Sequence, residues 1–253
     1  MGAGERRLLA ATPLHAITAL HGEAGLRERF AMEIARFPDA DRQRLERALD
    51  LAAALHAADR RQREPYLNHL LRVATRIISH YHVQDADVVC AALLHDAVED
   101  QGGRPMLRMI EQIFGAHVAK IVDGCTDSYV EDPKKKEGWE QRKFRYLRRV
   151  RHEDAETRFV SAADKLYNVR AVLRDLRYNG DLAFARFSAP KARIIWYYRS
   201  LVNEYRAGGV THLLKPLLDD LDRVVIEVEH LSGLLAASPS PHRRLTTKLK
   251  GKR

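Results

Sequence analysis

A stretch of ten residues, AALLHDAVED at 91–100, constrains the fold most, because it combines a buried helix with a histidine and three acids. Successive helical side chains turn by about 100°, so Glu99 and Asp96 lie at about 40° and 100° from His95. Asp100 follows at about 140°, and apolar residues fill the opposite arc and the turns just upstream. Charged helical faces are often simply solvated, but a helix that is apolar all round is normally buried. The sequence therefore predicts a buried helix whose acidic end needs a cation, a metal ion or hydrogen-bond donors.

The rest of the chain predicts an all-α protein. Stretches rich in Ala, Leu, Arg and Glu, few glycines and prolines, and 45% hydrophobic residues among 253 favour helices around a large core. Asp39 or Asp41 can cap the second helix, Pro65 suits the first turn of the third, and Asp85 can cap the fourth. Strand-like alternation is almost absent. We expect helices at about 15–36, 41–62, 64–82, 85–100, 106–116, 116–123, 139–151, 154–178, 190–207 and 212–235.

Composition argues against several classes of function. Six of the nine excess positive charges lie in the tail at 241–253, which reads as a flexible solubilising end, and no nucleic-acid motif accompanies them. Nucleic acid is therefore an unlikely partner. The chain has no apolar run of eighteen residues, so we expect neither export nor a membrane span. Cys90 and Cys125 form no disulfide or metal-thiolate pattern, which fits a cytoplasmic protein.

The chemistry-bearing residues are two histidines and two aspartates on three predicted helices. His69 shares a helix face with apolar residues and could be an ordinary core histidine. Asp164 precedes Asn168 by one turn and could be a cap or surface group. The His95-Asp96 doublet is more informative, because imidazole nitrogen and carboxylate oxygen together suit Mn²⁺, Fe²⁺ or Zn²⁺ better than Ca²⁺. These four side chains would hold one such ion and leave positions for water and substrate.

The order His69, His95-Asp96, Asp164 resembles the HD superfamily of metal-dependent phosphohydrolases. The words PYLNHLLRVA, AALLHDAVED, FGAHVAKIVDGCT, QRKFRYL and ADKLYNVR resemble the hydrolase half of the RelA/SpoT homologues, particularly the small stand-alone alarmone hydrolases. The resemblance covers roughly residues 44–177. It implies an HD-domain helical bundle with helical extensions at both ends and removal of the 3′-pyrophosphate of (p)ppGpp, giving GDP or GTP.

The resemblance also implies roles for single residues. His69, His95, Asp96 and Asp164 match the metal ligands, and the ion in that family is typically Mn²⁺. Glu99 and Asp100 match the acidic pair that activates or orients the attacking water. Substrate contacts fall on Asn168, on Lys143 as a phosphate partner, and loosely on Arg61, because the spacing before PY is compressed here. His117 and His152 read as surface residues, so we expect one metal ion.

Departures from the family pattern leave other questions open. The family usually has His-Pro where this chain has His69-Leu70, and we expect no synthetase or regulatory domain. We divide the chain into an extension at 1–40, the HD domain at 41–178, a packed C-terminal helical segment at 179–237 and a basic tail at 238–253. The aromatic residues of IIWYYRSLVNEYR read as core packing rather than a nucleobase shelf. The chain could form a homo-oligomer.

Two features leave the function open. The basic loop at 127–138 is either a solvated loop or a cover for an anionic substrate. Base preference is not fixed by the matched motifs. The alternatives are therefore an HD phosphohydrolase for another nucleotide or phosphoester, such as an adenosine alarmone, and a non-catalytic nucleotide-binding scaffold.

Overall fold

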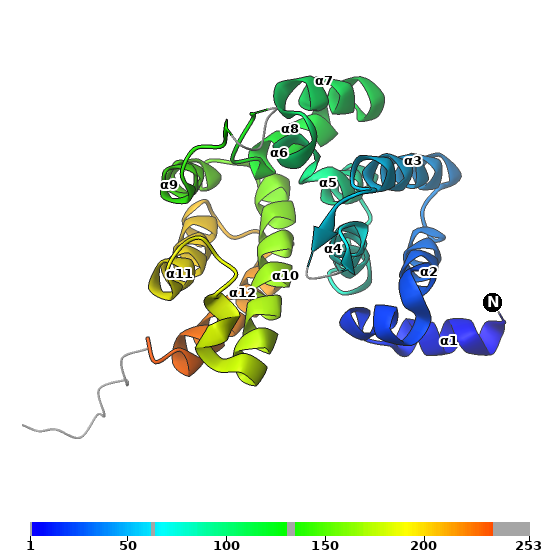
Figure 1. The fold of residues 1–253 in the computed structure, drawn as a ribbon. Coiled ribbons are helices and arrows are strands. Elements are labelled where there is room, and N and C mark those ends of the chain that lie inside the picture. Colours follow the sequence, from blue (N-terminus) through cyan, green and yellow to red (C-terminus); the bar gives the residue numbers. More distant parts are fainter. Residues whose placement is uncertain (1, 62–63, 131–134, 235–253) are drawn as a thin grey trace, which may run out of the picture.

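The computed structural model describes residues 2–61, 64–130 and 135–234 (Figure 1). It confirms an all-α architecture, with one two-stranded ribbon among the described residues. The elements are α1 (Ala3–Ala11), α2 (Leu14–Ile34), α3 (Asp39–Leu55), β1 (Arg60–Arg61), β2 (Glu64–Pro65), α4 (Leu67–Ser79), α5 (Ala86–Leu94), α6 (Ala97–Gln101), α7 (Gly103–Phe114), α8 (Ala116–Cys125), α9 (Trp139–Val150), α10 (Ala155–Asn179), η2 (Gly180–Phe184), α11 (Lys191–Ala207) and α12 (Leu214–Leu231).

The long helix α10 lies at the centre of the fold, with α2 to α5 on one side and α9, α11 and α12 on the other (Figure 1). It contacts α4, α5 and α8 on one side and α11 and α12 on the other. Fourteen of its residues are buried, including Phe159, Val160 and Leu166. Burial of such side chains contributes about 1.5–3 kcal/mol each relative to exposure, so α10 holds both halves of the chain on one core.

The N-terminal segment differs from the single helix expected at 15–36. It forms α1 and α2, and α2 is interrupted at Gly22, whose φ of 66° lies in the left-handed region that glycine tolerates. Arg29 ties the two helices together by donating to the carbonyls of Leu9 and Ala10, at 3.1 and 2.7 Å. Because α2 packs on α4, the extension borders the core of the chain.

The second and third expected helices are each shorter than predicted. The helix α3 ends at Leu55 instead of running to 62, and the chain then forms the antiparallel pair β1–β2, in which Arg60 lies opposite Pro65. Pro65 therefore lies in a strand and not in a first helical turn. Proline cannot donate to a ladder, which confines it to strand edges such as this one.

The central helix breaks where the sequence analysis expected it to continue. Asp85 caps α5 as predicted, accepting from the backbone amides of Asp87 and Val88. The helix then stops at Leu94, and a turn through His95 and Asp96 leads into the short helix α6. The polar side chains of 95–100 thus do not share one continuous helical face.

Two glycines redirect the chain after α6. Gly102 and Gly103 have φ of 137° and 59°. A Cβ at Gly103 would lie 2.1 Å from the carbonyl oxygen of Tyr129, so only glycine allows α7 to begin against that segment. The helix α7 therefore starts three residues before the predicted 106, and it brings residues 126–130 close to α6.

The C-terminal helices α11 and α12 pack on α9 and α10. The boundaries proposed at 40, 178 and 237 remain predictions, and the tail at 238–253 lies outside the described residues. Within 2–61, 64–130 and 135–234, none of the helices has the length and apolar character needed to span a membrane.

Candidate active site

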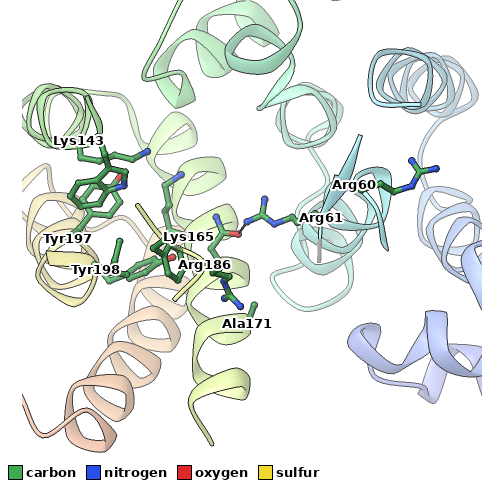
Figure 2. A pocket seen from close by; sticks show the side chains of 12 residues that line it. Arg60, Arg61, Lys143, Lys165, Ala171, Arg186, Tyr197 and Tyr198 are labelled. Carbon is green, nitrogen blue, oxygen red and sulfur yellow. Dashed lines mark hydrogen bonds between the residues drawn. The ribbon is translucent and has the colours of Figure 1, made fainter. Parts of the chain in front are cut away.

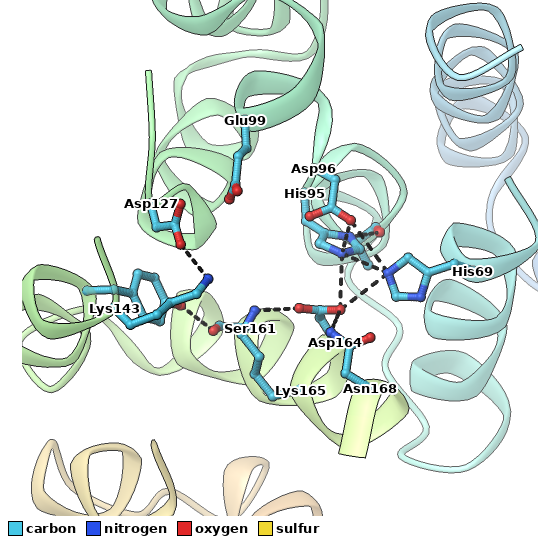
Figure 3. Close-up of polar contacts among 12 residues, drawn as sticks. His69, His95, Asp96, Glu99, Asp127, Lys143, Ser161, Asp164, Lys165 and Asn168 are labelled. Carbon is cyan, nitrogen blue, oxygen red and sulfur yellow. Dashed lines mark hydrogen bonds and ion pairs between the residues drawn. The ribbon is translucent and has the colours of Figure 1, made fainter. Parts of the chain in front are cut away.

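Four of the predicted site residues meet at the centre of the fold (Figure 3). His69 comes from α4, the doublet His95-Asp96 from the break between α5 and α6, and Asp164 from α10. The Nε2 atom of His69 lies 3.3 Å from that of His95 and 3.2 Å from Oδ1 of Asp164. The Oδ2 atom of Asp96 lies 3.1 Å from Nε2 of His95 and 3.5 Å from Nε2 of His69. We call these four side chains the His-Asp cluster.

The donor atoms of the cluster suit a divalent cation. His95 donates its Nδ1 proton to the carbonyl of Ala92 at 2.8 Å, which leaves the Nε2 lone pair for the centre. Such a second hydrogen bond is typical of metal-ligating histidines. His69, His95 and Asp164 are 1–3% exposed and can each offer one ligand atom within 4.8 Å of the others. Two imidazole nitrogens and carboxylate oxygens facing one another need a positive charge between them.

The electrostatics of the cluster point the same way. Burial disfavours a charged His95, yet the carboxylates of Asp96 and Asp164 raise its pKa to about 10. Burial opposes ionisation of Asp164 as well, but the Lys165 ammonium, 2.5 Å away, and the two histidines hold its pKa well below the usual range. The centre therefore attracts a cation, and a metal ion would compete with the proton on His95.

Hydrogen bonds from neighbouring residues fix the orientation of the two carboxylates. Asn168 donates to Oδ1 of Asp164 at 2.8 Å, and Arg61 donates to the side-chain oxygen of Asn168. Tyr66 donates to Oδ2 of Asp96 at 2.6 Å. Outer groups of this kind set ligand geometry and basicity. The predicted substrate residues Asn168 and Arg61 thus also hold the cluster in place.

The acidic pair lies beside the cluster on α6 and faces cations. Lys136 is 3.0 Å from Asp100 and 3.5 Å from Glu99, and Arg142 is 3.4 Å from Glu99. Burial and the Asp127 carboxylate nevertheless raise the pKa of Glu99 to about 7, and burial and Asp96 raise the pKa of Asp100. A carboxyl group with a pKa near 7 can take up and release a proton at neutral pH.

Lys143 contacts a different acid from those the sequence analysis considered. Its Nζ lies 2.5 Å from Oδ2 of Asp127, whose other oxygen accepts from Arg142 at 2.5 Å. Asp127 is buried, and these two cations hold its pKa below the usual range although burial opposes this. Lys143 is thus positioned by Asp127 and does not touch the His-Asp cluster.

All three predicted substrate residues line one cavity of about 450 Å³ next to the cluster (Figure 2). Lys165 and Asn168, which bind Asp164, form part of its wall. The cations on its lining are Arg60, Arg61, Lys143, Lys165 and Arg186. Trp139, Tyr197 and Tyr198 add aromatic surface, so two of the aromatic residues of α11, Tyr197 and Tyr198, both pack in the core and face the cavity. We call this space the catalytic-side cavity.

The sequence analysis missed several residues of the site. Lys165 follows Asp164 directly inside the quoted word ADKLYNVR, so its position next to a candidate ligand was a usable signal. Lys136 lies in the loop for which a role over an anionic substrate was left open. Nothing in the local sequence pairs Asp127 with α9, because that contact depends on how residues 126–130 fold back.

Comparison with known proteins places the chain in a family. The family model described as HD domain matches residues 48–188, and the chain belongs to this HD domain family. The chain is 40% identical over 111 residues to the guanosine-3′,5′-bis(diphosphate) 3′-pyrophosphohydrolase MESH1 of Danio rerio and 38% identical over 131 residues to that of Mus musculus. These matches cover 44% and 50% of this chain and 57% and 68% of the relatives.

One further relative and two solved structures are also similar to parts of the chain. The GTP pyrophosphokinase rsh of Brucella ovis is 32% identical over 136 residues, which is 53% of this chain and 18% of that protein. A solved structure, titled as a metazoan ortholog of SpoT that hydrolyzes ppGpp, superposes with a TM-score of 0.59 at 29% identity and covers 79% of this chain and 99% of its own. A Listeria monocytogenes protein superposes with a TM-score of 0.54 at 29% identity, over 65% of this chain and 99% of its own.

Proposed function

We propose that this protein is a metal-dependent hydrolase that removes the 3′-pyrophosphate of (p)ppGpp, releasing GDP or GTP. The observation that carries the proposal is that the buried His-Asp cluster adjoins a cationic and aromatic cavity. Lys165 and Asn168 bind Asp164 of the cluster and also line this cavity. The MESH1 relatives and the SpoT-like structure name the same reaction, and that agreement supports the proposal.

His69, His95, Asp96 and Asp164 would hold one divalent ion. We propose Mn²⁺, the ion typical of the family that the motifs resemble, and the borderline set of two nitrogens and two carboxylates would also accept Fe²⁺ or Zn²⁺. When bound, such an ion acts as a Lewis acid and lowers the pKa of water from 15.7 toward about 7. Asn168 and Tyr66 keep the two carboxylates turned toward the centre.

Glu99 and Asp100 handle the proton of the attacking water. The carboxylate of Glu99 accepts the proton, because its pKa of about 7 balances basicity against the fraction that is ionised at neutral pH. Lys136 lies between the two acids and keeps Asp100 oriented toward the same space. Assistance of this kind contributes roughly 10²–10⁴ in rate.

The catalytic-side cavity receives the charged substrate. Lys143, Lys165 and Arg61 offset phosphate charge and orient the pyrophosphate that leaves. Tyr197, Tyr198 and Trp139 offer apolar surface for the nucleoside. Both purines have π-faces that stack on such rings, so the cavity suits a purine nucleotide and the preference for guanine rests on the relatives.

The proposal is tested by incubating the full-length protein, stripped of metal, with ppGpp in the presence and absence of Mn²⁺. Anion-exchange chromatography separates the products. We expect GDP and pyrophosphate only with metal. The matched control is Glu111→Gln, which removes an exposed acid on α7 and should behave as the parent. Parallel reactions with Fe²⁺ and Zn²⁺ rank the metals.

Other outcomes would redirect the assignment. Turnover of adenosine 3′,5′-bis(diphosphate) but not of ppGpp would keep the metal chemistry and change the base. Metal-dependent binding without any product across a panel of nucleotides and phosphoesters would indicate a non-catalytic scaffold. Equal turnover with and without metal would contradict the role of the His-Asp cluster. Cytoplasmic location and the oligomeric state remain predictions.

A further inference from the structure

A second cavity lies on the other side of α10 from the catalytic-side cavity. It has a volume of about 700 Å³ and is lined by residues of α2, α4, α10 and α12. Its lining carries one acid, Glu227, and one histidine, His15. Five arginines face it, namely Arg72, Arg76, Arg170, Arg174 and Arg177. We call it the arginine cavity.

Three of these arginines have acidic partners. Arg72 is 2.5 Å from Glu64, and Arg177 pairs with Glu227. Arg170 lies 3.6 Å from Asp220, but that carboxylate also accepts from Tyr81 and lies near His80 and Arg223. The charge of Arg170 is thus only partly offset.

The other two arginines are unpaired. Arg76 and Arg174 make no side-chain hydrogen bond or ion pair with any residue of the described part of the chain. Both side chains are half-buried and line the same cavity. Arginine is almost never fully buried without a partner, and these two side chains are withdrawn from water only in part, which leaves both guanidinium groups free to bind a ligand that enters the cavity.

The potential in the arginine cavity is strongly positive. Burial lowers the pKa of His15, and the charges of Arg174, Arg76, Arg72 and Arg170 lower it further. Burial, Arg170 and Arg174 likewise lower the pKa of Arg76, and Tyr81 and Asp220 offset this only in part. Like charges one helical turn apart, as at positions 170 and 174, destabilise a helix. The arrangement costs folding free energy that an anion would recover.

We infer that the arginine cavity is a second ligand site, which binds a polyphosphate group. Arginine forks match phosphate oxygens bidentately, and two unpaired guanidinium groups can bind one phosphate chain without first breaking an ion pair. Tyr178, which is 87% exposed, stands on the rim and offers a ring on which a nucleobase can stack. The shared chemistry is a di- or triphosphate, either inorganic or carried by a nucleoside.

The arginine cavity is formed partly by residues outside the HD domain. Leu14 and His15 of α2 and Val224 and Glu227 of α12 lie outside residues 48–188, which match the family model. The cavity also adjoins a space of about 130 Å³ that is lined by His69 and Arg61 and shares Arg72, Arg174 and Tyr167 with it. The inference does not depend on the proposed function, because binding can be measured without turnover.

The test is calorimetric titration of inorganic tripolyphosphate into the full-length chain in buffer without added divalent cations. The double variant Arg76→Gln/Arg174→Gln should bind about 100-fold more weakly, because each of the two lost charge-assisted hydrogen bonds is worth about tenfold in affinity. Arg108→Gln, which removes an exposed charge on α7, is the matched control and should bind like the parent. Lys143→Gln, which alters only the catalytic-side cavity, should retain the arginine-cavity binding.

Two results would overturn the inference: equal binding by the double variant and Arg108→Gln, or complete loss of binding in Lys143→Gln. The melting temperature guards against misfolding. Without ligand, the single variant Arg174→Gln should melt at the parent temperature or about 1–2 °C higher, since a repulsion is removed. A lower melting temperature would assign Arg174 a structural role and would contradict the charge argument.

A second titration with GTP distinguishes the two sources of polyphosphate. A nucleotide ligand predicts that GTP binds at least about fivefold tighter than tripolyphosphate and that Tyr178→Ala removes this difference. Equal affinities, unchanged by Tyr178→Ala, would indicate an inorganic polyphosphate. Both results support the site, whereas no saturable binding of either compound would refute it.

Discussion

The two sides of α10 border sites of opposite charge. On one side, both carboxylate oxygens of Asp164 lie near a donor or a histidine nitrogen, and Asn168, four residues later, is one of these donors. On the other side, Arg170 and Arg174, also four residues apart, face a cavity whose lining holds a single acid. One helix thus borders an anionic site whose charges are compensated and a cationic site whose charges are compensated only in part.

The difference shows what each side is built to bind. The His-Asp cluster is largely buried, and its neighbouring cation and hydrogen bonds leave a net negative centre that can accept one more positive charge. The arginine cavity is larger than the catalytic-side cavity, and two of its five arginines lack an acidic partner, so it gains most from an anion. The charges of the proposed catalytic centre are thus largely balanced by neighbouring residues, whereas the proposed anion site keeps two arginines whose charges are not balanced.

The largest expected effect comes from Asp164→Asn, which keeps the size of the side chain and removes its charge. Loss of a ligand and of the field that attracts the cation should lower (p)ppGpp turnover by about 10⁴-fold or more. Elemental analysis should find less than the parent metal content, and Glu111→Gln should keep both metal and turnover. Full metal content in Asp164→Asn would show that the charge of Asp164 is not needed to hold the cation, and it would contradict the proposed difference between the two sides of α10.

The next effect is that of Glu99→Gln, which should retain the metal and reduce turnover by about 10³-fold, within the range for a lost general base. Asp96→Ala should lose both the metal and the activity. The measurement is a steady-state rate together with the metal content of each variant. Parent-like turnover in Glu99→Gln would show that Glu99 does not accept the proton of the attacking water.

A smaller effect is expected from Asn168→Ala, which cuts the hydrogen bonds that join Asp164 to Arg61. Loss of such an outer partner costs about 10–100-fold in metal affinity or activity. Titration with Mn²⁺ followed by rate measurement separates the two. Because Asn168 also lines the catalytic-side cavity, a rise in KM alone would assign it to the substrate and not to the cluster.

The smallest effect is a shift of the pH profile. Glu99 acts as a base only when it is deprotonated, so the parent rate should fall as the pH drops below about 7. Lys136 favours the ionised form, and Lys136→Gln should therefore raise the pKa of Glu99 and move the acidic limb to higher pH. Arg108→Gln serves as the charge-matched control, and an acidic limb that does not move would exclude Lys136 as a neighbour of the base.

Much of the fold could be predicted from the sequence because helix signals are local. The cap at Asp85 and the long helices α9, α10 and α11 follow from side-chain chemistry and periodicity over one or two turns. The ribbon β1–β2 could not be predicted, because two residues per strand carry no periodicity and the pairing depends on the turn between them.

The site could be predicted in part. The positions of His69, His95, Asp96 and Asp164 in the sequence suggested the cluster that the structure brings together, although their roles as ligands remain a proposal. The break after Leu94 was missed because its apolar neighbours favour a continuous helix, and tertiary contacts override that preference. Arg76 and Arg174 were missed because unpaired charges are indistinguishable from solvated ones until the packing is known.

The interruption between α5 and α6 also sets a condition for anyone who wishes to transplant this site to another scaffold. A continuous helix would place Glu99 one turn beyond His95, about 6 Å along a common axis and on a nearly common face. Here the turn at His95-Asp96 directs the doublet toward α4 and α10, while Glu99 faces Asp127 and Arg142 (Figure 3). A design that copied the six residues HDAVED into a regular helix would therefore contain the same side chains. It would not point the His-Asp doublet and Glu99 toward two different groups of neighbours.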